Sequence, residues 1–377
     1  MGEKPLVRTA IYTIQTNTKE NVVLVIAALA ALASSLFIKP SREYLNYFDY
    51  RTLTCLFCML AVICALNNIH FFEILSRKIV SVFKTTRASI LALVYITLLG
   101  SMLITNDMAL LIFLPLAYFV LNSTGQRKHI MFTFIMQNFA ANLGGMLTPF
   151  GNPQNLYLYS FFNIDSFEFI RIMLVPFVLS IVLITACCLF VKPEPLLLVD
   201  ELDNDLDIKK TVIYLALFIF SISIVLRGIP FFYGLLVITC ALLILDIKAL
   251  KDVDYALLLT FCAFFVFSGN VSRLPFVSHF FASFMHQNTL LTGIVSSQLI
   301  SNVPSAVLLS QFTTNYRDLL IAVNIGGVGT LVASLASLIT LKEFNRHYPG
   351  RQWSFIKRFS IYNFGFLAAL TLLCSLG

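Results

Sequence analysis

Two polar segments interrupt an otherwise apolar chain and carry residues suited to ion binding. The first reads NLGGMLTPFGNPQNL over residues 142–156, and the second reads NIGGVGTLVASLASL over residues 324–338. Glycines and prolines interrupt a regular helix, and the backbone carbonyls freed there can ligate a small cation. The half-helix that begins after such a break points its N–H groups and positive dipole end at an anion. Each segment therefore predicts half of an ion-binding site.

Two shorter polar tips divide the apolar runs 88–122 and 289–312. The first tip is ITND at residues 104–107, and the second is ISNVP at residues 300–304. Each arm before its tip is short, roughly half of the span that a transmembrane helix needs. Both runs therefore predict re-entrant hairpins.

Asp107 is a charged residue within an apolar run, between LLGSMLIT and MALLIFLP. An ionisable group at membrane depth is a functional candidate, and it could ligate sodium or carry a coupling proton. Alternatively, Asn106 or Asp107 only caps the arm that begins at Met108, or the tip lies outside the membrane. An uncharged cap would be less costly to bury, so an ion-binding role is the preferred hypothesis. For Arg273, which follows the predicted span 256–271, a helix-end charge that reaches the membrane interface is preferred over a substrate contact.

The composition is that of a membrane protein. Of 377 residues, 58% are hydrophobic and 12% are charged, whereas soluble chains have about 45–50% and about 25%. The net charge of +7 is explained by basic cytoplasmic loops without any nucleic-acid partner. We expect an all-α polytopic protein of the plasma membrane, in contact with the lipid bilayer. We expect no enzyme, because no histidine lies inside a span and Asp107 has no second aspartate beside it.

The elements that must position these residues are membrane-spanning helices and an inverted repeat. Basic residues flank both ends of the first hairpin, whereas residues 274–290 before the second contain no Lys or Arg, so the two hairpins should open to opposite sides. Segments 142–156 and 324–338 align without gaps. Such repeats are typical of secondary transporters. We expect spans at 21–38, 52–67, 130–159 (interrupted), 169–191, 211–226, 231–246, 256–271, 318–341 (interrupted) and 360–376.

This alignment divides the chain into three parts. The first repeat is predicted at residues 1–191, with the N-terminus in the cytoplasm. An acidic cytoplasmic linker follows at 192–210, and residues 211–377 contain a linking helix and the second repeat.

The two motif pairs resemble a known family. TNDMALLIFLPL followed by ANLGGMLTPFGNPQN resembles the first-half signature of the ion transporter superfamily, which includes divalent anion/sodium symporters, citrate permeases, and the arsenite permease and sodium/proton antiporter branch. SNVPSAVL followed by NIGGVGTLVASLASLITL is similar to the second-half signature of the arsenite permease branch. The resemblance covers residues 49–341 and implies two hairpins, two interrupted helices, a homodimer and elevator-type movement.

The resemblance also implies binding residues, by position. The cation-binding or coupling residues would be Thr105, Asn106, Asp107, Asn142, Gly144 and Gly145 in the first half, with Na⁺ at Thr105, Asn106, Asp107 and Asn142, and Ser301, Asn302, Asn324, Gly326 and Gly327 in the second. The substrate-binding residues would be Asn106, Thr148, Gly151, Asn152, Asn155, Asn302, Thr330, Ser334 and Ser337.

The expected function is secondary active transport of a small anion, either a carboxylate or an inorganic oxyanion. Na⁺ or H⁺ would be the coupling ion, with no other cofactor. Asp107 would repel a dicarboxylate unless sodium or a proton intervenes. Sodium/proton antiport, which Asp107 favours, and arsenite or antimonite efflux, which SNVPSAVL favours, remain alternatives. An ion channel is a more distant one.

Overall fold

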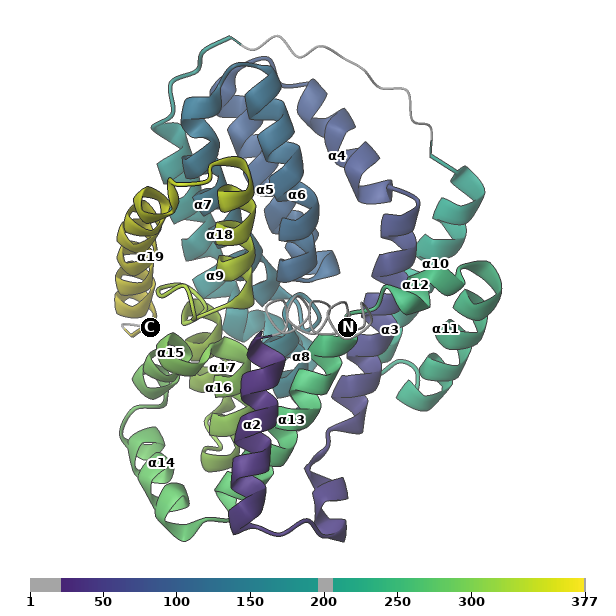
Figure 1. Ribbon diagram of the computed structural model, residues 1–377, viewed down its shortest axis with the longest axis vertical. Coiled ribbons are helices and arrows are strands. Elements are labelled where there is room, and N and C mark those ends of the chain that lie inside the picture. Colours follow the sequence, from purple (N-terminus) through teal and green to yellow (C-terminus); the bar gives the residue numbers. More distant parts are fainter. Residues whose placement is uncertain (1–21, 196–205, 376–377) are drawn as a thin grey trace, which may run out of the picture.

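The computed structural model describes residues 22–195 and 206–375, and within them the chain is helical, without a strand (Figure 1). Eight of its helices are long and apolar enough to cross a membrane. The predicted all-α polytopic membrane fold is therefore confirmed at this level. The helices are α2 (Val22–Phe37), α3 (Tyr50–Asn68), α4 (Phe71–Ser81), α5 (Thr86–Ile104), α6 (Asn106–Ser123), α7 (Ile130–Gly144), α8 (Pro153–Phe161), α9 (Ser166–Leu189), α10 (Ile208–Val225), α11 (Phe231–Leu245), α12 (Ile247–Lys251), α13 (Tyr255–Ser272), α14 (Pro275–Gln287), α15 (Thr289–Ile300), α16 (Asn302–Leu309), α17 (Tyr316–Ile325), α18 (Leu335–His347) and α19 (Gln352–Ser375), with short 3₁₀ helices η1 (Arg42–Tyr47), η2 (Arg127–His129), η3 (Gly145–Leu147) and η4 (Ser310–Phe312).

Each predicted tip is a single residue between two helices. Thr105 separates α5 from α6, and Ser301 separates α15 from α16. Both residues have a φ of 74°, with ψ of 152° and 155°. This is a region that glycine adopts freely and other residues adopt at a cost. The two tips therefore have the same strained backbone.

The arms of the first tip are longer than predicted. α5 has 19 residues and α6 has 18, which is enough for each to cross a membrane by length. The half-span expectation for the arm before each tip is wrong for α5 and correct for α15, which has 12 residues. α5 starts at Thr86, two residues before the predicted run, and Thr85 caps it by accepting a hydrogen bond from the Ala88 N–H.

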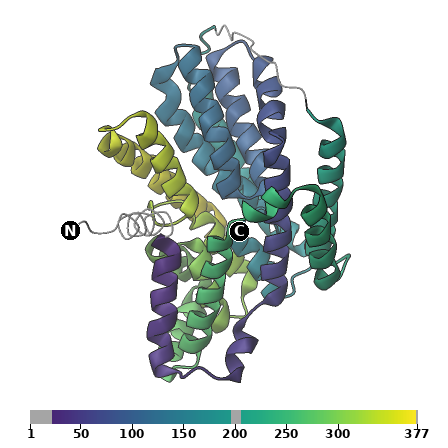
Figure 2. The same ribbon diagram turned by 45° about the vertical axis from the view of Figure 1, so that its right-hand side comes forward.

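Both predicted breaks are present. α7 ends at Gly144, and α8 begins at Pro153, where proline suits the first helical turn. α17 ends at Ile325, and α18 begins at Leu335. Figure 1 shows α5, α6 and α7 in one half of the molecule and α14, α15 and α16 in the other, and Figure 2 shows the same division from another side.

Two helices depart from the predicted spans near the C-terminus. α18 continues to His347 beyond the predicted end at Leu341, and α19 begins at Gln352 rather than Ser360. The added turns contain basic residues such as Lys357 and Arg358. Hydropathy marks where a helix enters the bilayer and not where its hydrogen bonds begin, so polar first or last turns were missed.

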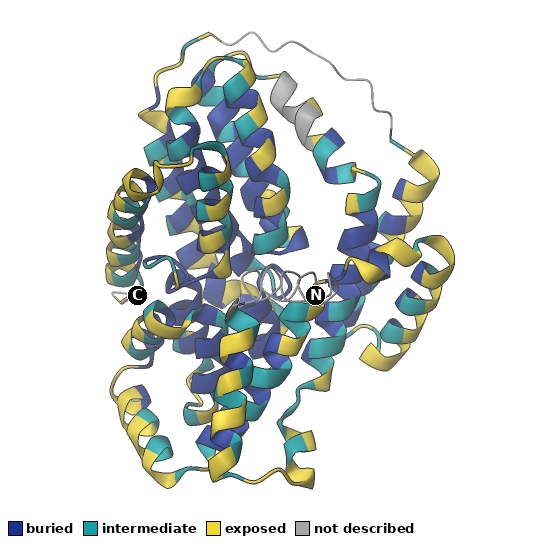
Figure 3. Ribbon diagram, viewed as in Figure 1, coloured by how far each residue is buried: buried dark blue, intermediate teal, exposed yellow. Residues whose placement is uncertain are grey.

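Burial separates the helices that hold the site from those that face outward (Figure 3). In α7, 13 of 15 residues are buried, whereas α11 buries only Gly234, Ile238 and Leu242. The exposed side chains of α11 are nevertheless apolar, including Phe232 and Ile244. This pattern fits a lipid-facing α11 and an α7 enclosed by protein.

The start of the predicted linker is fixed to the first hairpin. The backbone carbonyl of Glu194 accepts hydrogen bonds from the Thr86 N–H at 2.9 Å and the Thr86 hydroxyl at 3.1 Å. Its carboxylate pairs with Lys128 at 2.7 Å. Residues 196–205 of the predicted linker and the N-terminal residues 1–21 lie outside the described residues. The division into two repeats and a linker stays a prediction.

Candidate functional site

Each tip is held by its own break through a matching backbone contact. The Asn106 N–H donates to the Gly151 carbonyl at 3.2 Å, and the Asn302 N–H donates to the Ala333 carbonyl at 2.9 Å. Gly151 and Ala333 occupy the same position in the alignment of residues 142–156 with 324–338. The repeated sequence thus builds the same tip-to-break connection twice.

Thr148 and Thr330 join the breaks to the arms. The Thr148 hydroxyl donates to the Met102 carbonyl at 2.8 Å, and the Thr330 hydroxyl donates to the Gln298 carbonyl at 3.0 Å. Met102 and Gln298 each lie three residues before their tip residue. The two threonines, predicted as substrate ligands, therefore direct their hydroxyl hydrogens at the protein backbone.

The paired glycines of the breaks permit close packing. A Cβ on Gly144 would lie 2.6 Å from the Ser101 hydroxyl oxygen, and one on Gly326 would lie 2.9 Å from that of Ser297. Any side chain at either glycine would push the break away from its arm. These glycines hold the breaks against α5 and α15, which keeps the tips in place.

A cavity of about 280 Å³ lies where the tips and breaks meet α2 and α13. Four helices begin at its wall: α6 at Asn106, α8 at Pro153, α16 at Asn302 and α18 at Leu335. A helix N-terminus carries about half a positive elementary charge. Among the lining residues, all of them in the described part of the chain, Asp107 is the only charged side chain. Most of the remaining wall is apolar.

Three side-chain oxygens on this wall have no hydrogen-bond partner in the protein. They are Asn106 Oδ1, Asp107 Oδ1 and Gln154 Oε1, and all three are buried. A buried polar atom without a partner costs about 1–3 kcal/mol. Carboxylate and amide oxygens are ligands for hard cations, so this side of the cavity can hold a cation. The first residue of α6 has no capping side chain, so no contact supports the capping alternative there.

Asn324 joins the second break to the first. Its Oδ1 accepts from Asn152 Nδ2 at 3.2 Å and from Gln154 Nε2 at 3.5 Å, and its Nδ2 donates to Asn155 Oδ1 at 2.6 Å. Asn142, its counterpart in the first break, instead accepts from Asn106 Nδ2 at 3.2 Å. Asn142 therefore contacts its own tip, whereas Asn324 contacts the opposite break.

The predicted site residues divide into two groups. Those that line the cavity are Asn106, Asp107, Ser301 and Asn302. Those that lie outside its lining, at the tips and in the breaks, are Thr105, Asn142, Gly144, Gly145, Thr148, Gly151, Asn152, Asn155, Asn324, Gly326, Gly327, Thr330, Ser334 and Ser337. Ser334 caps α18 by accepting from the Ser337 N–H at 3.3 Å.

Sequence reasoning missed two glutamines. Gln154 lies within the quoted GNPQN motif, and its side chain reaches the cavity. Gln298 lies in the arm before the second tip, where it contacts the second break. Extending the tip alignment by three residues toward the N-terminus would have shown Gln298 opposite Met102 as a polar residue in an apolar arm.

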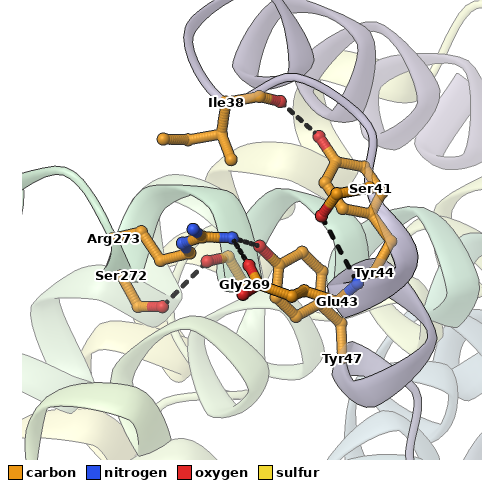
Figure 4. Close-up of polar contacts among 8 residues, drawn as sticks. All are labelled: Ile38, Ser41, Glu43, Tyr44, Tyr47, Gly269, Ser272 and Arg273. Carbon is orange, nitrogen blue, oxygen red and sulfur yellow. Dashed lines mark hydrogen bonds and ion pairs between the residues drawn. The ribbon is translucent and has the colours of Figure 1, made fainter.

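Arg273 is not among the residues that line the cavity. Its guanidinium donates to the Glu43 carboxylate and, at 3.2 Å, to the Tyr47 hydroxyl (Figure 4). The Tyr47 ring packs over Gly269, where a Cβ would lie 2.4 Å from the ring. Arg273 thus fixes η1 to the end of α13, in agreement with the preferred interpretation of a helix-end charge.

Comparisons with known proteins agree with this architecture. Residues 13–316 match the family described as Citrate transporter. An uncharacterized transporter of Methanocaldococcus jannaschii is 34% identical over 325 residues, which cover 85% of this chain and 89% of that protein. Inner membrane protein YbiR of Escherichia coli is 29% identical over 329 residues, which cover 84% and 86%. The matched family and the archaeal relative are transporters and not enzymes, as expected. This chain is therefore an integral, multi-pass membrane protein that belongs to the citrate transporter family, within the ion transporter superfamily that its motifs resemble.

Proposed function

We propose that the protein is a secondary active transporter that moves a small anion together with Na⁺ or H⁺. The observation that carries this proposal is the cavity on which two tips and four helix N-termini converge. Aligned N–H groups and dipoles at helix N-termini favour negative charge. A small carboxylate or an inorganic oxyanion is the class of solute that this arrangement accommodates.

Asp107 is the proposed coupling group. The cavity wall offers no Lys, Arg or His among its lining residues, so an entering anion meets one carboxylate and no cationic side chain. Two unit charges 4 Å apart repel by about 4 kcal/mol in a partly solvated protein site. A sodium ion held by Asp107 Oδ1, Asn106 Oδ1 and Gln154 Oε1, or a proton on Asp107, would remove this repulsion. Anion binding would then require the cation, which is the condition for coupled transport.

The proposed movement is an elevator-type displacement within a homodimer. The tips, α8 and α18 form one wall of the cavity, whereas residues of α2 and α13 form the other. Matching tip contacts, equal tip dihedral angles and the placement of the hairpins in opposite halves of the molecule support an inverted repeat. The short arms α15 and α16 support a re-entrant second hairpin, and in this proposal the first hairpin is re-entrant as well. In this proposal α2 and α13 belong to the fixed scaffold, and the N-terminus is cytoplasmic in the plasma membrane.

Sodium/proton antiport is the second candidate. It is favoured by the same cavity wall, because a site with one carboxylate and two amide oxygens without partners can exchange Na⁺ for H⁺ without any anion. Arsenite or antimonite efflux and a channel remain outcomes that the same experiment separates.

The test is charge movement by protein-containing liposomes on a solid-supported membrane. Concentration jumps of citrate, succinate, sulfate, arsenite and sodium are applied at two pH values to the wild type, to Asp107→Asn and to Asp165→Asn. Asp165 is a matched control, since it only caps α9 at an exposed position.

We expect a saturable current for one anion, and we expect this current to need sodium or a pH gradient. It should be lost in Asp107→Asn and kept in Asp165→Asn. Currents evoked by sodium alone would favour antiport. Currents that grow without saturation would favour a channel. Silence for every jump would contradict the proposed substrate class.

A further inference from the structure

The second break is filled by the side chain of Gln298, which projects from α15 one turn before the tip. Gln298 Nε2 donates to the Gly326 carbonyl at 2.8 Å and to the Val328 carbonyl at 3.0 Å. Gln298 Oε1 accepts from the Thr330 N–H at 2.8 Å. One amide therefore holds three backbone groups of the break.

These contacts fix the orientation of the amide. The Thr330 N–H can only donate, so the Gln298 atom beside it must be the oxygen. The other atom is then the nitrogen of the NH₂ group, and it faces two carbonyl oxygens that each require a hydrogen-bond donor or a cation. Helix breaks expose such carbonyls at membrane depth, where they must be satisfied by protein, water or an ion.

The first break is satisfied differently. Met102 occupies the position equivalent to Gln298, and its thioether cannot donate. Asn155 Nδ2, from α8, instead donates to the Gly145 and Met146 carbonyls at 3.2 and 3.3 Å. Side-chain oxygens nevertheless remain without partners on the cavity wall of this half, with Asp107 among them.

The second half retains no such oxygen near its tip. Asn302 Oδ1 accepts from the Val303 N–H at 2.9 Å, and the Ser301 hydroxyl donates to the Ala333 carbonyl at 3.3 Å. Among the described residues, the buried side-chain oxygens without a partner include none from the second tip or the second break. Val303 stands where the first tip has Asp107, so the second tip also lacks a carboxylate at this position to attract a cation.

We propose that the Gln298 amide occupies the second break in place of a cation, so that the protein has a single cation site, at the first tip. The location of that single site rests on the proposed function. The amide is uncharged and covalently attached, so it satisfies the Gly326 and Val328 carbonyls at any sodium concentration and pH. The second break therefore contributes a permanent structure to the solute cavity and takes no part in coupling.

Gln298→Glu tests the assignment because it exchanges the NH₂ group for an oxygen. One carboxylate oxygen can still accept from Thr330, while the other faces two carbonyl oxygens and needs a cation between them. Gln352→Glu is the matched control, since it adds the same charge at an exposed position at the start of α19. The probe is ²²Na⁺ alone, measured by equilibrium binding to the purified full-length protein.

The wild type and Gln352→Glu are expected to bind one Na⁺ per chain, and Asp107→Asn none. Gln298→Glu should bind two, a twofold gain, and should become thermally more stable as sodium is added. If Gln298→Glu does not fold, the wild-type capacity decides, because two Na⁺ per chain would overturn the proposal.

Other outcomes separate this proposal from the proposed function. A Gln298→Glu protein that binds no more Na⁺ than the wild type overturns the assignment of the second break. A wild type that binds none, with one gained in Gln298→Glu, supports that assignment and shows that sodium is not the coupling ion at the first tip.

Discussion

The two half-sites have the same backbone conformation at their tips, and they differ in which side-chain oxygens are left without a hydrogen-bond partner. Both tip residues have a φ of 74°, and both tips receive the same contact from their break. At the first tip Asp107 brings a charge and an oxygen without a partner, whereas Val303 brings neither. The residues that repeat therefore build the frame, and the residues that do not repeat decide which half can bind a cation.

The breaks differ in the same way. In the first break, Asn155 of the following helix α8 donates to the Gly145 carbonyl. In the second break, Gln298 of the preceding arm α15 donates to the Gly326 carbonyl. Asn324, unlike Asn142, makes no side-chain hydrogen bond to the asparagine of its own tip and contacts the first break instead. Loss of symmetry in one contact thus creates a connection between the halves.

The largest expected effect comes from removing that connection. Asn324→Ala leaves Asn155 Oδ1 without its donor and deprives the Asn152 and Gln154 amides of an acceptor. We expect a loss of about 3 kcal/mol in the free energy of unfolding, since each buried group left without a partner costs about 1–3 kcal/mol. Asn302→Ala, which removes only a local contact to Val303, should cost about 1 kcal/mol.

Denaturant unfolding of the purified protein in detergent measures both variants. Equal losses for Asn324→Ala and Asn302→Ala would show that the connection between the breaks contributes no more than a local contact.

A smaller effect, of opposite sign, is expected at the strained tips. Thr105→Gly should raise stability by about 1 kcal/mol, because relief of about 1–3 kcal/mol of backbone strain exceeds the entropy cost of glycine, about 0.5–1 kcal/mol. Ser301→Gly should be close to neutral, because it also loses the hydrogen bond to the Ala333 carbonyl.

Thermal unfolding compares these variants, with Thr105→Ala as the control that keeps a Cβ and so relieves no strain. A gain for Thr105→Ala as large as that for Thr105→Gly would contradict the strain explanation.

The sequence predicted the frame of the site well. A Thr-Asn or Ser-Asn pair within an apolar run placed both tips correctly, and paired glycines placed both breaks, with Pro153 as a further signal in the first. These signals are local, because they reflect the conformational preferences of a few neighbouring residues. Repetition of the pattern at two places made the frame easier to identify.

The partners across the molecule were not predictable in this way. Asn324 was assigned to its own half because its neighbours repeat those of Asn142, yet it contacts the first break. Gln298 was overlooked because a glutamine in this arm matches no motif, and its role depends on the Gly326 and Val328 carbonyls, 28 and 30 residues further along the chain. Such contacts depend on how helices pack, which alignment of one half with the other does not contain.

The smallest expected effect concerns the mouth of each hairpin, that is, the end of its two arms away from the tip. Glu194 accepts hydrogen bonds from Lys128 and Gln126 at the first mouth, and these lower the pKa of its carboxyl group. Because the folded pKa is depressed, the contact stabilises the mouth above the ordinary glutamate value of 4.5 and is lost as the pH falls through the lowered value. The second mouth is joined by Phe281 stacked on Phe312 at 5.2 Å between ring centroids, which does not titrate.

Hydrogen exchange between pH 7 and pH 3, corrected for intrinsic rates, measures this difference. The Thr86 amide, which donates to the Glu194 carbonyl, should lose a little protection in acid, while amides around Phe312 should not. Glu194→Gln should remove the pH dependence at Thr86 and leave the tips unchanged, because the carboxylate lies at the far end of α5 from Thr105. Equal acid sensitivity at both mouths, or its persistence in Glu194→Gln, would show that Glu194 is not its source. The mouths would then contribute nothing to the asymmetry between the hairpins, which would rest on the lengths of their arms and on the cation chemistry of their tips and breaks.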